Sequence, residues 1–247
     1  MKQNKTALIT GGSSGIGKSI AIRLAKEGVK VCINFSKSKD KALEVKKEIE
    51  NLGGIAIIYK ADITQEDQVE GMFEFLSSEF GTLDILINNA GIYIPDFIET
   101  HDVTTWDAVM NLNLKAKLLC TKYAIPLLKK SSEARIINIA TRAASQSMEE
   151  SSAYCCAATG IVMLSKVSAL ELSKYSIKVN TISPGLTRTP MTEAVDPDEE
   201  FDNYAKKNPS GRVGLPEDIA NTVNFLVSQE AEFINGENIN VSGGILL

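Results

Sequence analysis

Hydrophobic and polar positions along this chain predict strands and helices in alternation. Short strand-like runs occur at residues 7–10, 29–35, 55–59, 83–88, 135–140, 177–182 and 238–241. The run at 29–35 is almost continuously apolar, as expected of a strand covered on both faces. Longer stretches with helical spacing lie between or after them, at residues 16–27, 40–52, 65–80, 106–129, 152–174 and 216–228. We expect Thr64 to cap the third helix, and Pro126 to end or kink the fourth. Strict alternation predicts an α/β fold, a doubly wound parallel sheet of about seven strands with helices on both faces.

Length and composition favour one domain over residues 1–247 and argue against several classes of protein. The net charge of −5 provides no basic surface for nucleic acid. By our reading no apolar run approaches the ~20 residues of a membrane span, and the apolar run after the basic residues 1–5 is too short for a signal peptide. The four cysteines show no metal-ligand spacing, and the single histidine, His101, reads as a loop residue. We therefore expect a cytoplasmic protein without a metal, a nucleic-acid partner or a membrane partner.

One late segment differs from the rest of the chain. Residues 191–210 are acidic and contain Pro197 and Pro209, so we expect the least ordered part of the molecule there. A long insertion at this place in an α/β fold is more often a lid than a separate domain.

A glycine-rich loop at residues 10–17 joins the first predicted strand to the first predicted helix. Glycines at Gly11, Gly15 and Gly17 allow a tight turn and a close approach of the backbone to a ligand. The first N–H groups of the helix and the positive end of its dipole point to the same place, which favours a diphosphate. Taken alone, the loop also has a second interpretation, an ordinary glycine-rich turn, which would apply in roughly one case in three.

Further polar or glycine-rich clusters follow the other predicted strands. In a doubly wound sheet such clusters meet outside the carboxyl ends of the strands, where ligands bind. After the glycine loop they are Asp62 with Ile63, residues 88–91, Thr141, and Pro184 with Gly185. Turn chemistry alone does not explain so many clusters on one edge.

Together these clusters resemble the short-chain dehydrogenase/reductase family, and within it the 3-oxoacyl-thioester reductase branch, over essentially the whole chain. The resemblance implies a Rossmann-type fold, an adenine contact from Asp62, and a nicotinamide carboxamide held by Thr189 and the backbone near Ile182. Residues 211–214, 216–220 and 235–244 match the C-terminal part of the family, with Ser242 in place of its usual aspartate. The implied cofactor-binding residues are Gly11, Ser13, Ser14, Gly15, Ile16, Gly17, Phe35, Ser36, Lys37, Asp62, Ile63, Asn89, Ala90, Gly91, Pro184, Gly185, Thr187 and Thr189.

The end of the second strand indicates the choice of cofactor. An NAD enzyme usually has an acidic residue there, which accepts a hydrogen bond from the ribose 2′-hydroxyl. Here Phe35 takes that position, and Lys37 with Ser13 and Ser36 could meet a 2′-phosphate. This pattern favours NADP(H) over NAD(H), although Lys37 could equally be a solvated loop lysine.

The family's catalytic residues are asparagine, serine, tyrosine and lysine, and two of these positions differ here. By resemblance, Asn113 anchors a water molecule for proton relay and Tyr154 is the acid or base at the substrate oxygen. Thr141 stands at the serine position and keeps a hydroxyl group. Ala158 stands at the lysine position, one helical turn after Tyr154, and has neither charge nor donor. We expect cofactor binding to weaken and turnover to fall by orders of magnitude.

The leading interpretation is an NADP(H)-dependent reductase of a carbonyl or acyl-thioester substrate, impaired at position 158. The alternatives are a nucleotide-binding protein without turnover and a non-redox enzyme that uses Tyr154 and Thr141. We also expect a homotetramer, because the helix at 152–174 is apolar around much of its surface and the chain ends in an apolar segment. The apolar residues are Ile161, Val162, Leu164, Val167, Leu170, Leu172, Ile245, Leu246 and Leu247.

Overall fold

A seven-stranded parallel sheet forms the centre of the molecule, as a computed structural model of residues 5–194 and 198–246 shows. Its strand order is β3-β2-β1-β4-β5-β6-β7, and every neighbouring pair is parallel. The predicted doubly wound fold is therefore confirmed. The strands are β1 Thr6–Ile9, β2 Lys30–Phe35, β3 Ala56–Lys60, β4 Ile85–Asn88, β5 Arg135–Ile139, β6 Lys178–Pro184 and β7 Asn238–Val241.

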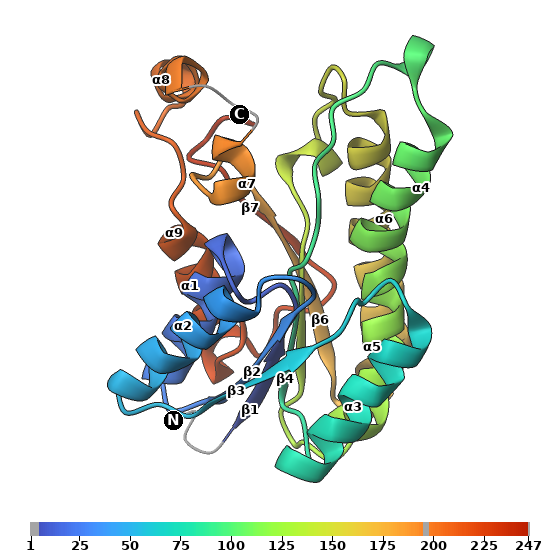
Figure 1. Ribbon diagram of the computed structural model, residues 1–247, viewed down its shortest axis with the longest axis vertical. Helices are drawn as coiled ribbons and strands as arrows, with labels where there is room; N and C mark the ends of the chain where they lie inside the picture. The colour runs from blue at the N-terminus through green and yellow to red at the C-terminus, as the bar shows by residue number, and fades with distance from the viewer. Residues whose placement is uncertain (1–4, 195–197, 247) are drawn as a thin grey trace.

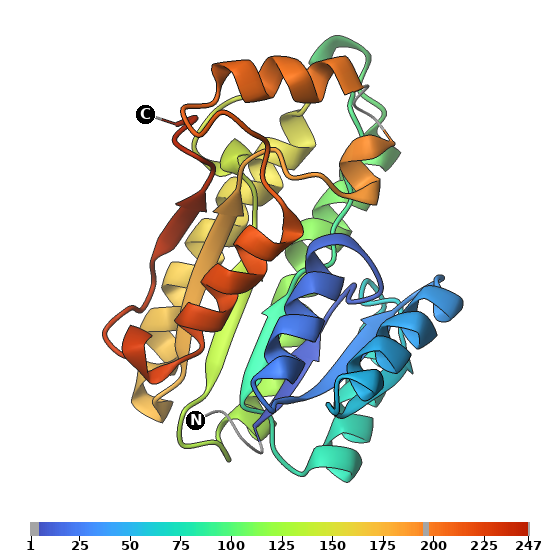
Figure 2. The same ribbon diagram turned by 90° about the vertical axis from the view of Figure 1, so that its left-hand side faces the viewer.

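Helices cover both faces of this sheet (Figure 1). Helices α1, α2 and α9 lie on one face, which Figure 2 views from the front, and α3 to α6 lie on the other. The α-helices are α1 Gly15–Lys26, α2 Lys39–Asn51, α3 Glu66–Phe80, α4 Val103–Met110, α5 Ala116–Leu128, α6 Ser152–Leu172, α7 Pro190–Glu193, α8 Asp198–Lys207 and α9 Pro216–Leu226. Shorter helical turns are η1 Ile98–Thr100, η2 Asn111–Lys115, η3 Arg142–Ala144, η4 Ser173–Tyr175 and η5 Gln229–Ala231.

The two faces of the sheet form separate hydrophobic cores. Successive side chains of a strand point to opposite faces, so Ile9 packs with α1, α2 and α9 while its neighbour Leu8 packs with α3, α5 and α6. Both residues are fully buried. Covering on both sides explains why consecutive positions of β1 and β2 are apolar in the sequence.

Two details of the expected helices were wrong. The helix predicted over residues 106–129 begins earlier, at Val103, because Asp102 caps it by accepting a hydrogen bond from the Thr104 N–H at 3.0 Å. It is also interrupted by the π-helical turn η2, beyond which Pro126 lies in the last turns of α5. Thr64 does not cap α3, because its hydroxyl group donates to Asp62 Oδ1 at 2.8 Å instead.

The acidic segment after β6 is largely helical where it is described, and its role as a lid stays a prediction. Helices α7 and α8 occupy most of it, and residues 195–197 lie outside the described part of the chain. Packing orders α8: Phe201 is buried beneath the Arg188 guanidinium, 4.3 Å from the ring centre, and the Tyr204 hydroxyl accepts from the Leu186 N–H at 3.2 Å. Figure 2 shows α8 crossing above the carboxyl ends of the strands.

Helix α6 corrects one expectation about apolar runs. With η4 it forms a 24-residue helix, Ser152–Tyr175, of mean hydropathy 1.5, which is long and apolar enough to cross a membrane by length and composition alone. Here it packs against β6 and η3, and its buried residues include Ala157, Ile161 and Ala169. Only 33% of its apolar window is buried within the chain, and Met163, Val167 and Leu170 are exposed.

Candidate active site

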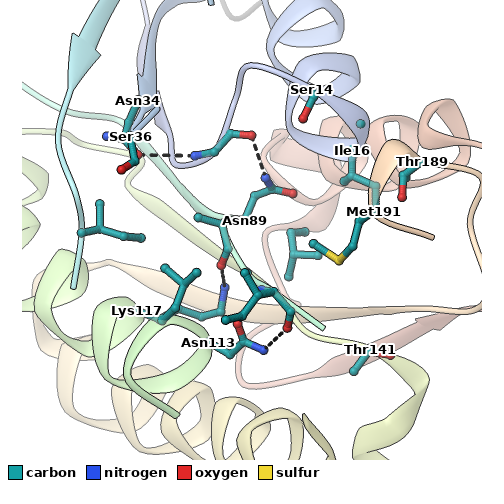
Figure 3. Close-up of a pocket in the computed structure, with 18 of the residues that line it drawn as sticks. Ser14, Ile16, Asn34, Ser36, Asn89, Asn113, Lys117, Thr141, Thr189 and Met191 are labelled. Carbon is teal, nitrogen blue, oxygen red and sulfur yellow. Dashed lines mark hydrogen bonds between the residues drawn. The ribbon is translucent and has the colours of Figure 1, made fainter. Parts of the chain in front are cut away.

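A cavity of about 1020 Å³ opens at the carboxyl edge of the sheet. Segments that follow six strands, β1 to β6, line it, and these contain all the clusters predicted to meet there (Figure 3). The sheet order places β1 beside β4, so the cavity lies where the chain reverses its direction of travel across the sheet.

The glycine loop forms one wall of the cavity, and its backbone requires glycine. Gly11 and Gly15 have φ angles of +62° and +52°, which side chains rarely allow. A Cβ atom at Gly17 would lie 2.6 Å from Asn89 Nδ2 and closer still to the Gly11 carbonyl oxygen. Ser14 precedes α1 in extended conformation and makes no side-chain cap, which leaves the first turn of the helix open to a ligand. The loop therefore fits a diphosphate.

The loop after β4 is fastened to the glycine loop. Asn89 Nδ2 donates to the Thr10 carbonyl oxygen at 2.9 Å, and the Thr10 hydroxyl accepts from the N–H groups of Asn89 and Ala90 at 2.9 and 3.1 Å. These contacts hold Asn89, Ala90 and Gly91 along the cavity as one unit with β1.

Asn113 holds the next residue of this loop. It is buried in the π-helical turn, where its Nδ2 donates to the Ile92 carbonyl oxygen and its Oδ1 accepts from the Ile92 N–H, both at 2.8 Å. Asn111, two residues away, is exposed. The Asn113 side chain is thus engaged with the backbone. Its expected role by resemblance, anchoring a water molecule, stays a prediction.

The end of β2 presents a hydroxyl and an amine to the cavity. Phe35 is buried in the core with α1 and α2, whereas Ser36 and Lys37 are exposed at the rim. Buried Asn34 connects the strand ends, since its Oδ1 accepts from the Gly11 N–H at 3.4 Å and its Nδ2 donates to the Ala61 carbonyl oxygen at 3.1 Å.

Asp62, after β3, also lines the cavity. Its Oδ1 accepts from the N–H and hydroxyl groups of Thr64 at 3.0 and 2.8 Å, which fixes the carboxylate at the rim. The adjacent Ile63 side chain is buried, although the residue borders the cavity. The adenine contact of Asp62 stays a prediction.

The three catalytic candidates from β5 and α6 face the same cavity. Thr141 follows β5, Tyr154 lies in the first turn of α6, and Ala158 lies one turn further on, buried against the cavity wall. Burial raises the pKa of Tyr154 above its usual value, and the Thr141 hydroxyl and the Arg142 charge act in the opposite direction. The site thus keeps Tyr154 in its neutral, proton-bearing form near neutral pH.

Residues after β6 close the cavity on the other side. Thr189 caps α7 by accepting from the Thr192 N–H at 3.3 Å, and the Thr187 hydroxyl donates to the Gly185 carbonyl oxygen at 3.0 Å. Pro184 and Gly185 border the cavity as well, and a Cβ atom at Gly185 would lie 2.7 Å from the Tyr204 hydroxyl. Contact with a nicotinamide carboxamide stays a prediction.

Sequence reasoning missed Lys117. This lysine of α5 lines the cavity but is 2% exposed, and its Nζ donates to the carbonyl oxygens of Asn88 and Ala90 at 2.9 and 3.1 Å. Burial lowers its pKa to about 8. Figure 3 shows it beside Asn113. The sequence does indicate this residue: it lies four positions after Asn113, among buried positions of one helical face. It escaped prediction because the family pattern places the lysine on the helix of Tyr154.

Comparisons with known proteins agree with this geometry. Residues 11–246 match the family model described as enoyl-(acyl carrier protein) reductase. A 3-oxoacyl-(acyl-carrier-protein) reductase FabG of Staphylococcus aureus is 37% identical over 247 residues, with both chains covered completely. That of Staphylococcus epidermidis is 36% identical over 244 residues, which cover 99% of this chain and 100% of its own.

Solved structures point the same way. A short-chain type dehydrogenase/reductase from Mycobacterium marinum superposes with a TM-score of 0.93 at 30% identity, covering 98% of this chain and 96% of its own. A double mutant of a Serratia marcescens short-chain dehydrogenase/reductase gives the same score and identity, with 99% of each chain covered. The chain belongs to the short-chain dehydrogenase/reductase family, a family of NAD(P)-dependent oxidoreductases, and its curated relatives include 3-oxoacyl-(acyl-carrier-protein) reductases.

Proposed function

We propose that this protein is an NADP(H)-dependent carbonyl reductase of the 3-oxoacyl-thioester type. The observation that carries the proposal is the single cavity that combines a diphosphate cradle with a buried tyrosine and a neighbouring threonine. When bound, the nicotinamide cofactor supplies or accepts the hydride. The names of the S. aureus and S. epidermidis relatives support an acyl-thioester as the carbonyl substrate.

In this proposal the dinucleotide is held along the edge of the sheet. The glycine loop and the start of α1 bind the diphosphate, Asp62 and Ile63 border the adenine, and Asn89 to Gly91 line the middle. The residues after β6, Pro184, Gly185, Thr187 and Thr189, border the nicotinamide side.

Two side chains act on the substrate oxygen. In reduction the Tyr154 hydroxyl donates its proton to the carbonyl oxygen, while the Thr141 hydroxyl donates a hydrogen bond to the same oxygen. Burial, which raises the Tyr154 pKa, makes the resulting tyrosinate costly. With Ala158 at the position of the family's lysine, no charge from that position offsets the cost, so we infer slow turnover.

A preference for NADP(H) over NAD(H) completes the proposal. The side chain of Phe35 is buried, so the position where an NAD enzyme has an acid offers no acceptor for a ribose 2′-hydroxyl. Lys37 and Ser36, exposed at the same rim, are suited to a 2′-phosphate.

We further propose a homotetramer. Ile161 and Leu172 of the apolar set on α6 are buried within the chain, but Val167 and Leu170 are exposed, as is Met163 beside them. These exposed apolar side chains support a subunit contact through α6. The apolar chain end gives less support, because Leu247 lies outside the described residues. Light scattering of a dilute sample should give four times the 26.7 kDa chain mass, and a mass of one chain would contradict this.

A nucleotide-binding protein without turnover is the second candidate, and Ala158 is the observation that favours it. A non-redox enzyme that uses Tyr154 and Thr141 is a third, favoured by the same residue. For each candidate the proposed compartment is the cytoplasm, which the four free cysteines, at 32, 120, 155 and 156, support.

One pair of measurements separates these candidates. NADPH is titrated by fluorescence, and its oxidation is then followed at 340 nm with a short 3-oxoacyl thioester, with Tyr154→Phe as the control. We expect binding together with slow oxidation that disappears in the Tyr154→Phe variant. Binding without oxidation of NADPH would favour the second or third candidate, and failure to bind would exclude a dinucleotide function.

A further inference from the structure

Lys117 is a buried cation at the cavity that has no carboxylate partner. No ion pair to Lys117 occurs within residues 5–194 and 198–246, and its neighbour Cys120 stays neutral because burial raises the pKa of that thiol to about 12. Burying an ammonium group without an opposite charge costs several kcal/mol, so such groups are concentrated at functional sites.

Backbone carbonyl oxygens engage the ammonium group of Lys117. An ammonium group has three N–H donors. Two of them reach the Asn88 and Ala90 carbonyl oxygens. Because Lys117 borders the cavity, its third N–H can serve a ligand there.

Lys117 of α5 and Ala158 of α6 both border the cavity. The turn that precedes Lys117 packs closely on α6, since a Cβ atom at Gly160 would lie 2.8 Å from Leu114 Cδ2. Of the three lysines that border the described cavity, Lys37 and Lys115 are exposed at the surface and only Lys117 is buried. Position 117 thus supplies an internal positive charge to a cavity in which position 158 supplies none.

We propose that Lys117 is the cofactor-binding cation of this site, with its ammonium group donating a hydrogen bond to a sugar hydroxyl of the dinucleotide. The proposal rests on the proposed function, because it requires a dinucleotide in the cavity. The two carbonyl oxygens aim the ammonium group, and the third N–H meets the ligand. In this chain α5 therefore provides the sugar contact that the family pattern places on α6, while the effect of that lysine on Tyr154 stays absent.

The proposal predicts a particular pH dependence of cofactor affinity. Only the protonated amine has the third donor and the charge, and burial lowers the pKa of Lys117 to about 8. NADPH affinity should therefore stay constant below about pH 7 and fall as the pH rises through and above about 8.

The test is a fluorescence titration of NADPH from about pH 6.5 to 9.5 with three proteins. They are the unaltered chain, Lys117→Met, which keeps the apolar stem but removes the terminal amine and its charge, and Lys47→Met, a control on the exposed face of α2. In Lys117→Met we expect affinity at pH 7 to fall about tenfold or more, together with a flat profile over the alkaline range. Lys47→Met should match the unaltered chain. Equal affinities and equal profiles in all three proteins would overturn the proposal.

A second measurement requires no substitution, in case Lys117→Met fails to fold. The rate of Lys117 acetylation in the unaltered protein is followed by peptide mass spectrometry against pH, with and without NADP⁺. Protection of Lys117 by NADP⁺ is the expected result, and an unchanged rate at saturating NADP⁺ would overturn the proposal. If the unaltered chain binds NADPH but Lys117 proves irrelevant, only this inference fails; if no dinucleotide binds at all, the proposed function fails first.

Discussion

The side-chain amide of Asn113 hydrogen-bonds both backbone groups of Ile92. It makes two hydrogen bonds of 2.8 Å, one to the N–H and one to the carbonyl oxygen of that residue. The two residues are 21 positions apart, and the contact joins the π-helical turn to the loop after β4. This buried amide therefore helps to fix the shape of the cavity on this side, together with the bonds that Thr10 and Lys117 make to the same loop.

Replacing this amide should destabilise the protein measurably. Asn113→Ala leaves both backbone groups of Ile92 without their partner, which costs about 2–4 kcal/mol in the free energy of unfolding. Urea denaturation at a fixed protein concentration measures the change. Asn111→Ala, at an exposed position of the same turn, is the matched control and should stay within about 0.5 kcal/mol. Equal effects of the two substitutions would show that the hydrogen bonds to Ile92 contribute little to the free energy of unfolding.

Gly17→Ala should damage both stability and cofactor binding. The added Cβ atom would overlap the Gly11 carbonyl oxygen and Asn89 Nδ2, so the loop must shift away from its present path. We expect a loss of about 1–3 kcal/mol and at least about tenfold weaker NADPH binding, measured by thermal unfolding and fluorescence titration. Gly71→Ala within α3 is the control: its Cβ would meet only the Tyr59 hydroxyl at 3.4 Å, and helix propensity should make it neutral or stabilising by up to about 1 kcal/mol. Normal NADPH affinity in Gly17→Ala would contradict the diphosphate assignment.

Lys37→Ala should reduce the preference for NADPH over NADH. The lysine is exposed, so its interaction with a 2′-phosphate is partly screened, and we expect a loss of about fivefold in the ratio of the two affinities. Parallel titrations with the two cofactors measure the ratio. Lys39→Ala, at the exposed start of α2, serves as the control. An unchanged ratio would exclude Lys37 as the discriminating residue, and tighter binding of NADH by the unaltered chain would refute the cofactor assignment itself.

Ala158→Lys should restore turnover. A lysine one helical turn after Tyr154 places a positive charge at the cavity wall, which stabilises tyrosinate and should raise the rate near neutral pH by about a hundredfold. In alcohol oxidation the unaltered chain should speed up as pH rises through and above about 10, because burial raises the Tyr154 pKa. The lysine variant should reach its plateau at lower pH.

Stopped-flow pH–rate profiles of both proteins test this prediction. Tyr154→Phe should abolish the activity in either background. Suppose that the Ala158→Lys variant folds and binds NADPH but gains no activity on any carbonyl. The alanine is then not the sole cause of low activity, and a binding protein or a non-redox enzyme becomes the favoured interpretation.

The sheet could be predicted from the sequence because its central strands are largely apolar runs. Leu8 and Ile9 fill opposite cores, so neighbouring positions of β1 are both apolar, and β2 shows the same pattern over most of its length. The glycine loop, Tyr154 and Ala158 were found from local spacing, which survives in a linear sequence.

What escaped prediction depends on contacts between distant segments. The helicity of residues 198–207 rests on the packing of Phe201 and Tyr204 against residues that precede them, and the acidic composition gave no sign of it. Lys117 meets the loop of Asn88 and Ala90 across 27 or more positions, so a search along one helix could not find it. The π-helical turn is defined by its backbone hydrogen bonds, which no residue pattern in the sequence predicts.

The sheet order also decides when the site comes into existence during synthesis. The glycine loop leaves the ribosome first, but the amide that braces it, Asn89, is separated from Thr10 by 79 positions. Thr189, against which Gly15 packs, comes later still, and the Gly185 N–H finds its acceptor only in Val241. Contacts of such separation form late and slowly, so we expect a nascent chain to bind dinucleotide only when almost its last strand has emerged. Stabilisation by the ligand would then be confined to completed chains.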